Sequence, residues 1–153
     1  MGIQSILKTF SATATLLLAH YGAFTCATKP QTYGIVLVRA FDTLDVYAPI
    51  EILQLVSSMH KIQISLIAET PEVTTEPMAA MMNPFNSTVW PRVPTTLTFA
   101  TAPRDFDVLI IPGGPGVRSP YINSTLEWIK EVAARAGTVI TIFHIYATTL
   151  RYA

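Results

Sequence analysis

The chain has 153 residues, enough for one domain, and its basic and acidic residues balance to a net charge of zero. Without an excess of positive charge, there is no electrostatic basis for binding nucleic acid or an anionic membrane surface. Half of the residues are apolar and only 13% are charged, which is apolar for a soluble domain. Part of this apolar excess lies in the first 27 residues.

Residues 1–27 have the features of a secretory signal peptide. Lys8 gives a weakly positive start, and residues 10–19 form an apolar run of the expected length. Small residues around Ala27 suit cleavage after that position. The run is too short for a membrane span, which needs about 20 apolar residues. We therefore expect a secreted protein whose mature chain, residues 28–153, has no membrane span; a buried N-terminal helix is the alternative.

The cysteine content and two N-glycosylation motifs also bear on the secretory pathway. Cys26 is the only cysteine, so a mature chain that begins after Ala27 contains neither a thiol nor a disulfide. Asn86 and Asn123 each begin an Asn-Ser-Thr motif, the acceptor sequence for N-glycosylation. Chance occurrence in a Thr-rich chain is the alternative. Behind a signal peptide, the two motifs predict a glycoprotein.

The mature chain alternates between apolar runs and helical patterns. Residues 69–105, rich in Pro and Thr, predict a loop with an extended piece at 95–99. The order of strands and helices predicts an α/β fold with a parallel sheet. Buried strands are expected at residues 33–38, 62–68, 108–111 and 138–143, and helices at 46–59 and 124–136.

The ends of the two helices carry recognisable signals. Asp45 is a natural N-cap for the first helix, and Pro49 is placed in its first turn, where proline is tolerated. Asn123 or Ser124 caps the second helix, and Gly137 closes it. The apolar residues of the first helix fall into two sets at helical spacing: Val46, Ile50, Leu53 and Val56, and Ile52, Leu55 and Met59.

A glycine-rich turn, Pro112 to Gly116, follows the apolar run at 108–111. Adjacent glycines let the backbone adopt positive φ and leave N–H groups with no side chain in front of them. Ligands of open α/β sheets bind just past the carboxyl ends of the strands. The sequence therefore predicts a small anion-accepting turn at Gly113 and Gly114.

Three segments within residues 33–142 resemble the ThiJ/PfpI family of the class I glutamine amidotransferase-like folds, in particular its isonitrile hydratase branch. They are YGIVLVRAFDTLDVYAPIEILQLV, FDVLIIPGGPGVR and LEWIKEVAARAGTVITI. The order and spacing of the segments agree with the family. The resemblance implies a flavodoxin-like three-layer sandwich with a mostly parallel sheet.

The resemblance also implies roles for individual residues. Glu51 matches an acidic residue that hydrogen-bonds the catalytic cysteine, and Asp45 matches an aspartate used in catalysis by the isonitrile hydratase branch. The N–H groups at Gly113 and Gly114 match the family's oxyanion-binding turn. A carboxylate beside a thiol orients it or exchanges protons with it, and paired N–H donors stabilise a developing negative charge. Capping of the helix remains the simpler interpretation of Asp45.

The nucleophile of the family has no counterpart in this sequence. The strand that resembles TVITI ends in a cysteine in the family, whereas Phe143 stands there, followed by His144. The resemblance stops at residue 142, so we expect a domain truncated before or at the nucleophile elbow, with the C-terminal part of the fold missing. Such a domain is inactive as given, and its parent is a cysteine-dependent hydratase or hydrolase-like enzyme, a lyase. His144 is interpreted as incidental.

The alternative is a non-catalytic domain of the same fold that binds a small molecule or a partner around Glu51 and Gly113. The three histidines show no metal-ligand spacing, and phosphate-loop and dinucleotide patterns are absent, so neither a metal nor a cofactor is expected. The small-molecule ligand is not identified by the sequence, and a homodimer is left open. Uncovered sheet surface beside residues 138–143 predicts self-association.

Overall fold

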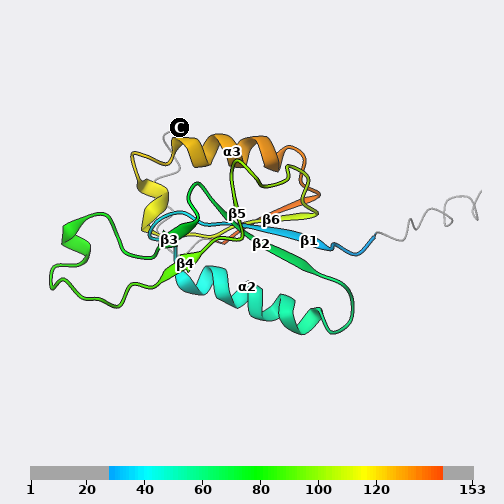
Figure 1. The fold of residues 1–153 in the computed structure, drawn as a ribbon, viewed down its shortest axis with the longest axis horizontal. Helices are drawn as coiled ribbons and strands as arrows, with labels where there is room; N and C mark the ends of the chain where they lie inside the picture. The colour runs from blue at the N-terminus through cyan, green and yellow to red at the C-terminus, as the bar shows by residue number, and fades with distance from the viewer. Residues whose placement is uncertain (1–27, 143–153) are drawn as a thin grey trace, which may run out of the picture.

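The computed structural model describes residues 28–142, which form a five-stranded parallel sheet between two helices (Figure 1). The predicted α/β, flavodoxin-like arrangement is confirmed. Helices α2 (Thr43–Val56) and α3 (Asn123–Ala133) cover opposite faces of the sheet. The strand order is β5-β2-β1-β6-β7, with bounds Leu97–Thr98, Gln63–Ala68, Thr32–Val36, Val108–Ile111 and Thr138–Thr141 respectively.

Each face of the sheet has its own apolar core because successive side chains of a strand point to opposite faces. On the α2 face, Ile35 and Ile110 pack with Val46 of the helix. On the α3 face, Leu109 packs with Val132 and Trp128. The central strands β1 and β6 contribute side chains to both cores, which explains why the sequences of these two strands are continuously apolar.

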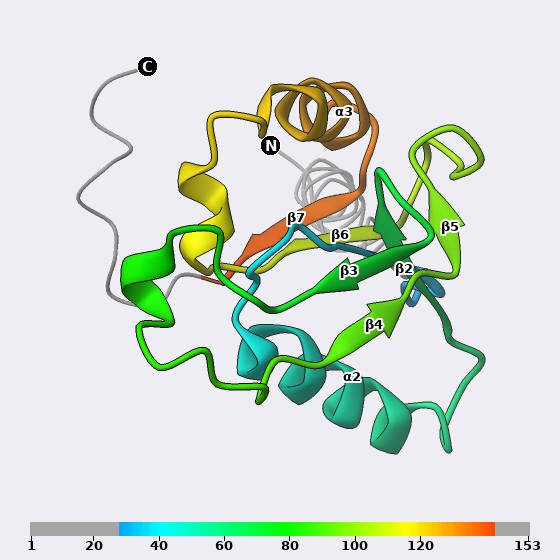
Figure 2. The same ribbon diagram turned by 60° about the vertical axis from the view of Figure 1, so that its left-hand side comes forward.

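The Pro- and Thr-rich excursion builds a small second sheet (Figure 2). Strands β3 (Glu72–Thr74) and β4 (Arg92–Pro94) pair antiparallel, and the loop between them carries the short 3-10 helix η1 (Ala80–Met82). The extended piece expected at 95–99 is present, and β5 within it joins the main sheet parallel to β2. A second 3-10 helix, η2 (Pro115–Arg118), follows the glycine turn.

The predicted start of the first helix is wrong. Helix α2 begins at Thr43, with Asp42 at the N-cap position, so Asp45 lies in the first turn and Pro49 is the seventh helical residue. Asp45 is not the cap because it lies inside the helix, and its carboxylate accepts the N–H of Gly113 in the glycine turn. Of the two predicted apolar sets, Ile50 and Leu53 pack against the core, whereas Ile52, Leu55 and Met59 are 61–73% exposed.

The second helix also differs at its ends. Ile122 occupies the N-cap position with no side-chain cap hydrogen bond, so neither Asn123 nor Ser124 is the cap. The helix ends at Ala133, and Gly137 lies beyond it. The N–H of Gly137 donates to the carbonyl of Phe106, 3.1 Å away, which aligns β7 with β6 instead of closing the helix.

Strand β7 is an exposed edge strand, so the prediction of a buried strand there is wrong, whereas the uncovered sheet surface expected beside residues 138–143 is present. Val139 and Ile140 are 40% and 43% exposed. In the described part of the chain, β7 pairs with β6 alone, and α3 packs over the neighbouring central strands. None of the helices in residues 28–142 is long and apolar enough to cross a membrane.

Asp107 fastens the start of β1 to the start of β6. Its Oδ2 accepts hydrogen bonds from the N–H groups of Gln31 (2.7 Å) and Thr32 (2.9 Å). These two bonds to the ionised carboxylate, followed by one from the Thr32 side chain, lower the pKa of Asp107 below its usual 3.8. A carboxylate of lowered pKa contributes stability that is present above the unfolded-state pKa and is lost as pH falls through the folded-state pKa.

We therefore expect Asp107→Asn to lower the urea midpoint of unfolding at pH 7. The difference from the parent chain should shrink as pH falls below the usual value of 3.8, because the parent then loses the same ionised group. The control is Asp105→Asn, which removes a neighbouring exposed carboxylate that makes no hydrogen bond within residues 28–142. A difference that stays constant down to acid pH would contradict this account.

Candidate functional site

The carboxyl edge of the sheet carries the candidate site. From β1 the chain moves through α2 to β2 on one side, and from β6 through α3 to β7 on the other. The connections after β1 and β6 therefore diverge, which opens a crevice at the carboxyl ends of these neighbouring strands. The loop 37–42 and the glycine turn 112–116 face each other there, joined by backbone hydrogen bonds.

Asp45 and Gly113 form a buried hydrogen bond in this crevice. The Gly113 N–H donates to Asp45 Oδ2 at 3.0 Å, and Asp45 is only 6% exposed. In the other direction, the Asp42 N–H donates to the Gly113 carbonyl at 3.0 Å. The predicted anion-accepting turn therefore holds the chain's own carboxylate, and α2 is locked to the turn through its first helical residues.

The glycines of the turn are required by close backbone approach. Gly114 has φ of 130°, and a Cβ there would lie 2.5 Å from the Ala40 carbonyl oxygen. A Cβ on Gly116 would lie 1.6 Å from the Arg39 carbonyl oxygen. The turn therefore rests directly on the loop that follows β1, with no side chain between the two backbones.

The other predicted site residues lie apart from the buried pair. Glu51 is exposed on α2, about 9 Å further along the helix axis than Asp45, and makes no hydrogen bond or ion pair within the described residues. Asn86, in the loop after η1, and Asn123, at the start of α3, are both exposed. Phe143 lies outside the described residues. Of the two predicted carboxylates, the structure thus brings only Asp45 to the glycine turn.

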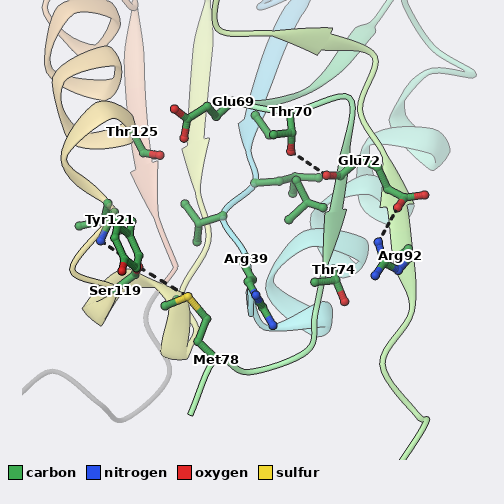
Figure 3. Close-up of a pocket in the computed structure, with 16 residues that line it drawn as sticks. Arg39, Glu69, Thr70, Glu72, Thr74, Met78, Arg92, Ser119, Tyr121 and Thr125 are labelled. Carbon is green, nitrogen blue, oxygen red and sulfur yellow. Dashed lines mark hydrogen bonds and ion pairs between the residues drawn. The ribbon is translucent and has the colours of Figure 1, made fainter. Parts of the chain in front are cut away.

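A cavity of about 320 Å³ opens beside this crevice, over the carboxyl ends of β1 and β2 (Figure 3). Its size suits a small ligand. Sequence reasoning missed it because its walls come from the loop after β1 and from β2, β3, β4, η2 and α3, none of which carries a local motif for binding. Its polar lining comprises Arg39, Glu69, Thr70, Glu72, Thr74, Arg92, Ser119, Tyr121 and Thr125. Within residues 28–142, no cluster of His, Cys, Asp and Glu could hold a metal ion.

Comparison with known proteins identifies the fold. No protein-family model and no curated protein matches this sequence. A crystal structure of a ThiJ/PfpI family protein from Pseudomonas syringae superposes with a TM-score of 0.56 at 21% identity, over 78% of this chain and 46% of that one. The chain has a ThiJ/PfpI-like fold. The resemblance drawn from the three sequence segments is confirmed at this level.

A second solved structure has the same fold. It is a cysteine-to-alanine mutant of a DJ-1 superfamily protein from Salmonella typhimurium, with a TM-score of 0.51 and 16% identity, matched over 72% of this chain and 54% of that one. The ThiJ/PfpI-like chain therefore spans about half the length of the solved structures that it matches. At such low identities, the neighbours establish the fold and leave the activity to be argued from residues.

Proposed function

We propose that this chain is a ThiJ/PfpI-family domain, related to isonitrile hydratase and amidotransferase-like enzymes, that has no thiol-dependent activity. The ThiJ/PfpI-like fold, with its glycine turn joined to Asp45, supports the family assignment. The proposed lack of thiol-dependent activity rests on the absence of cysteine after Cys26. At the position expected for the nucleophile, Phe143 has no lone pair with which to attack a substrate.

Activity and thiol assays test this proposal. The purified chain, cleaved after Ala27, should neither hydrate isonitriles to formamides nor hydrolyse glutamine, and iodoacetamide should leave its intact mass unchanged. A ThiJ/PfpI enzyme that retains its cysteine serves as the positive control for both assays. Turnover by this chain that is lost in Asp45→Asn would overturn the proposal, because Asp45 is the one predicted carboxylate that lies at the turn.

The second candidate function is binding of a small molecule or a partner without catalysis. It is favoured by the open cavity of about 320 Å³ at the carboxyl edge of the sheet, where ligands of this fold class bind. Unlike the thiol chemistry, this function needs no group that the sequence lacks. Equilibrium binding therefore separates the two candidates.

We also propose that the protein is secreted and glycosylated. Support comes from the signal-like residues 1–27 and from the exposed positions of Asn86 and Asn123. Expressed in a eukaryotic host, the chain should appear in the medium with its N-terminus near residue 28, and removal of N-glycans should lower its mass. The double variant Asn86→Gln/Asn123→Gln should show no such decrease. An intact Met1 with no glycan in the parent chain would contradict the proposal.

A further inference from the structure

The cavity over β1 and β2 combines an apolar floor with polar walls. Leu37, Ala68 and Val73 contribute buried apolar surface at its base. Around them, hydroxyl, carboxylate and guanidinium groups come from several elements, as Figure 3 shows. Such a cavity excludes water from one side of a ligand and fixes its orientation through a few polar groups.

Thr125 supplies an unsatisfied polar group in this cavity. It lies in the first turn of α3, only 6% exposed, and its hydroxyl has no hydrogen-bond partner among the described residues. Figure 3 shows the hydroxyl turned towards the cavity, on the side where Glu69 lies. Unlike the buried, unpartnered atoms Trp90 Nε1 and Arg104 Nη1, this hydroxyl keeps accessible surface, so a ligand in the cavity can bond to it.

Two more groups of opposite hydrogen-bonding character adjoin Thr125. The first-turn N–H groups of α3 have no side-chain cap, and among them the N–H of Thr125 belongs to a residue that lines the cavity. Glu69 accepts a hydrogen bond from the Ser124 hydroxyl at 3.1 Å and keeps further lone pairs as acceptors. The wall thus offers a donor, an acceptor and a hydroxyl that can do either.

The charges of the lining decide between ligand classes. Arg39 and Arg92 are balanced by Glu69 and Glu72, and Arg92 is already paired with Glu72 at 3.0 Å. The negative charge of Glu69, which is hydrogen-bonded to Ser124 at the start of α3, would repel a ligand anion at that helix end. A purely apolar ligand would leave the Thr125 hydroxyl unpaired and would desolvate Glu69.

We propose that this cavity binds a small neutral molecule with several hydroxyl groups, of the size of a monosaccharide or cyclic polyol. Its hydroxyls donate to Glu69, exchange a hydrogen bond with Thr125 and accept from the α3 backbone, while its C–H faces rest on the apolar floor. This inference deepens the non-catalytic binding function proposed above. It does not depend on the absence of a thiol, so a failed binding test leaves the activity proposal intact.

The test is a titration of the full mature chain with D-glucose and with myo-inositol, followed by amide chemical shifts. The protein is made in a bacterial host without N-glycosylation, because Thr125 also belongs to the sequon at Asn123. Three variants are compared with the parent: Thr125→Val, Glu69→Gln, and the control Thr88→Val, which alters an exposed loop residue outside the cavity. Inorganic phosphate is titrated in parallel.

We expect at least one polyol to shift cavity amides at millimolar concentration. Thr125→Val should weaken binding about tenfold, the loss of one well-placed hydrogen bond, and should leave the melting temperature of the unliganded chain nearly unchanged. Glu69→Gln should weaken polyol binding, and Thr88→Val should change neither property. The proposal is overturned if neither polyol binds, if Thr125→Val binds as the parent does, or if phosphate binds instead and Glu69→Gln strengthens its binding.

Discussion

Replacing Gly116 with alanine is expected to destabilise the domain by about 3 kcal/mol or more, at the high end of overpacking effects. The added Cβ would overlap the Arg39 carbonyl oxygen, 1.6 Å away, and would lie 2.9 Å from the Arg39 carbonyl carbon. Both atoms belong to the backbone of the loop after β1, so no side-chain rotation relieves the overlap. A loss of this size is a large part of a domain's usual stability of about 5–15 kcal/mol.

Gly34→Ala is the matched control, because it adds the same methyl group to a buried glycine of β1. There the nearest atoms, 3.1–3.2 Å away, belong to the side chains of Ile67 and Phe106, which can shift. We expect a cost of about 1 kcal/mol, at the low end of overpacking effects. The measurement is urea unfolding followed by tryptophan fluorescence. The midpoints of the variants are compared provided that the dependence of the unfolding free energy on urea concentration is the same. Equal midpoints for the two variants would contradict the proposed contact between turn and loop.

The three-layer fold was predictable because its signals are local. The runs in β1 and β6 lack polar alternation, which indicates burial on both faces, and helical spacing appears between the predicted strands. Strand β5 was harder to place in the sheet, since a strand of two residues, Leu97–Thr98, has no pattern of its own. Burial of β7 itself was wrongly predicted because Val139 and Ile140 have the side chains of core residues, while burial depends on which strands α3 covers. The uncovered sheet surface beside residues 138–143 was predicted.

The candidate site was only partly predictable, because some of its features have local sequence signals and others arise only from tertiary packing. The glycine turn follows from the sequence, because adjacent glycines directly after a buried strand indicate a tight backbone turn. The role of Asp45 required the structure: both a helix cap and a partner of Gly113 place an aspartate near the start of α2. The cavity over β1 and β2 could not be predicted from the sequence, because Glu69 and Thr125 come to line the same cavity only once the sheet has formed.

Self-association of the mature chain is the second large effect that we expect. Strand β7 presents an edge that is unpaired within the described residues, and Val139 and Ile140 on it are 40% and 43% exposed. On α2, Ile52 and Leu55 add further exposed apolar surface, at 61% and 71%. Full burial of one such side chain contributes roughly 1.5–3 kcal/mol, so covering several of them favours association strongly.

Sedimentation velocity over a range of concentrations, with two double variants, identifies the surface responsible. Val139→Thr/Ile140→Thr keeps the strand propensity of β7 but removes its exposed apolar groups, and Ile52→Lys/Leu55→Lys places charge on α2. We expect the β7 variant to reduce association more, because an edge strand adds backbone hydrogen bonds to apolar contact. A strictly monomeric parent chain with a cooperative melt above about 50 °C, within the range usual for mesophile domains, would show that neither surface drives association.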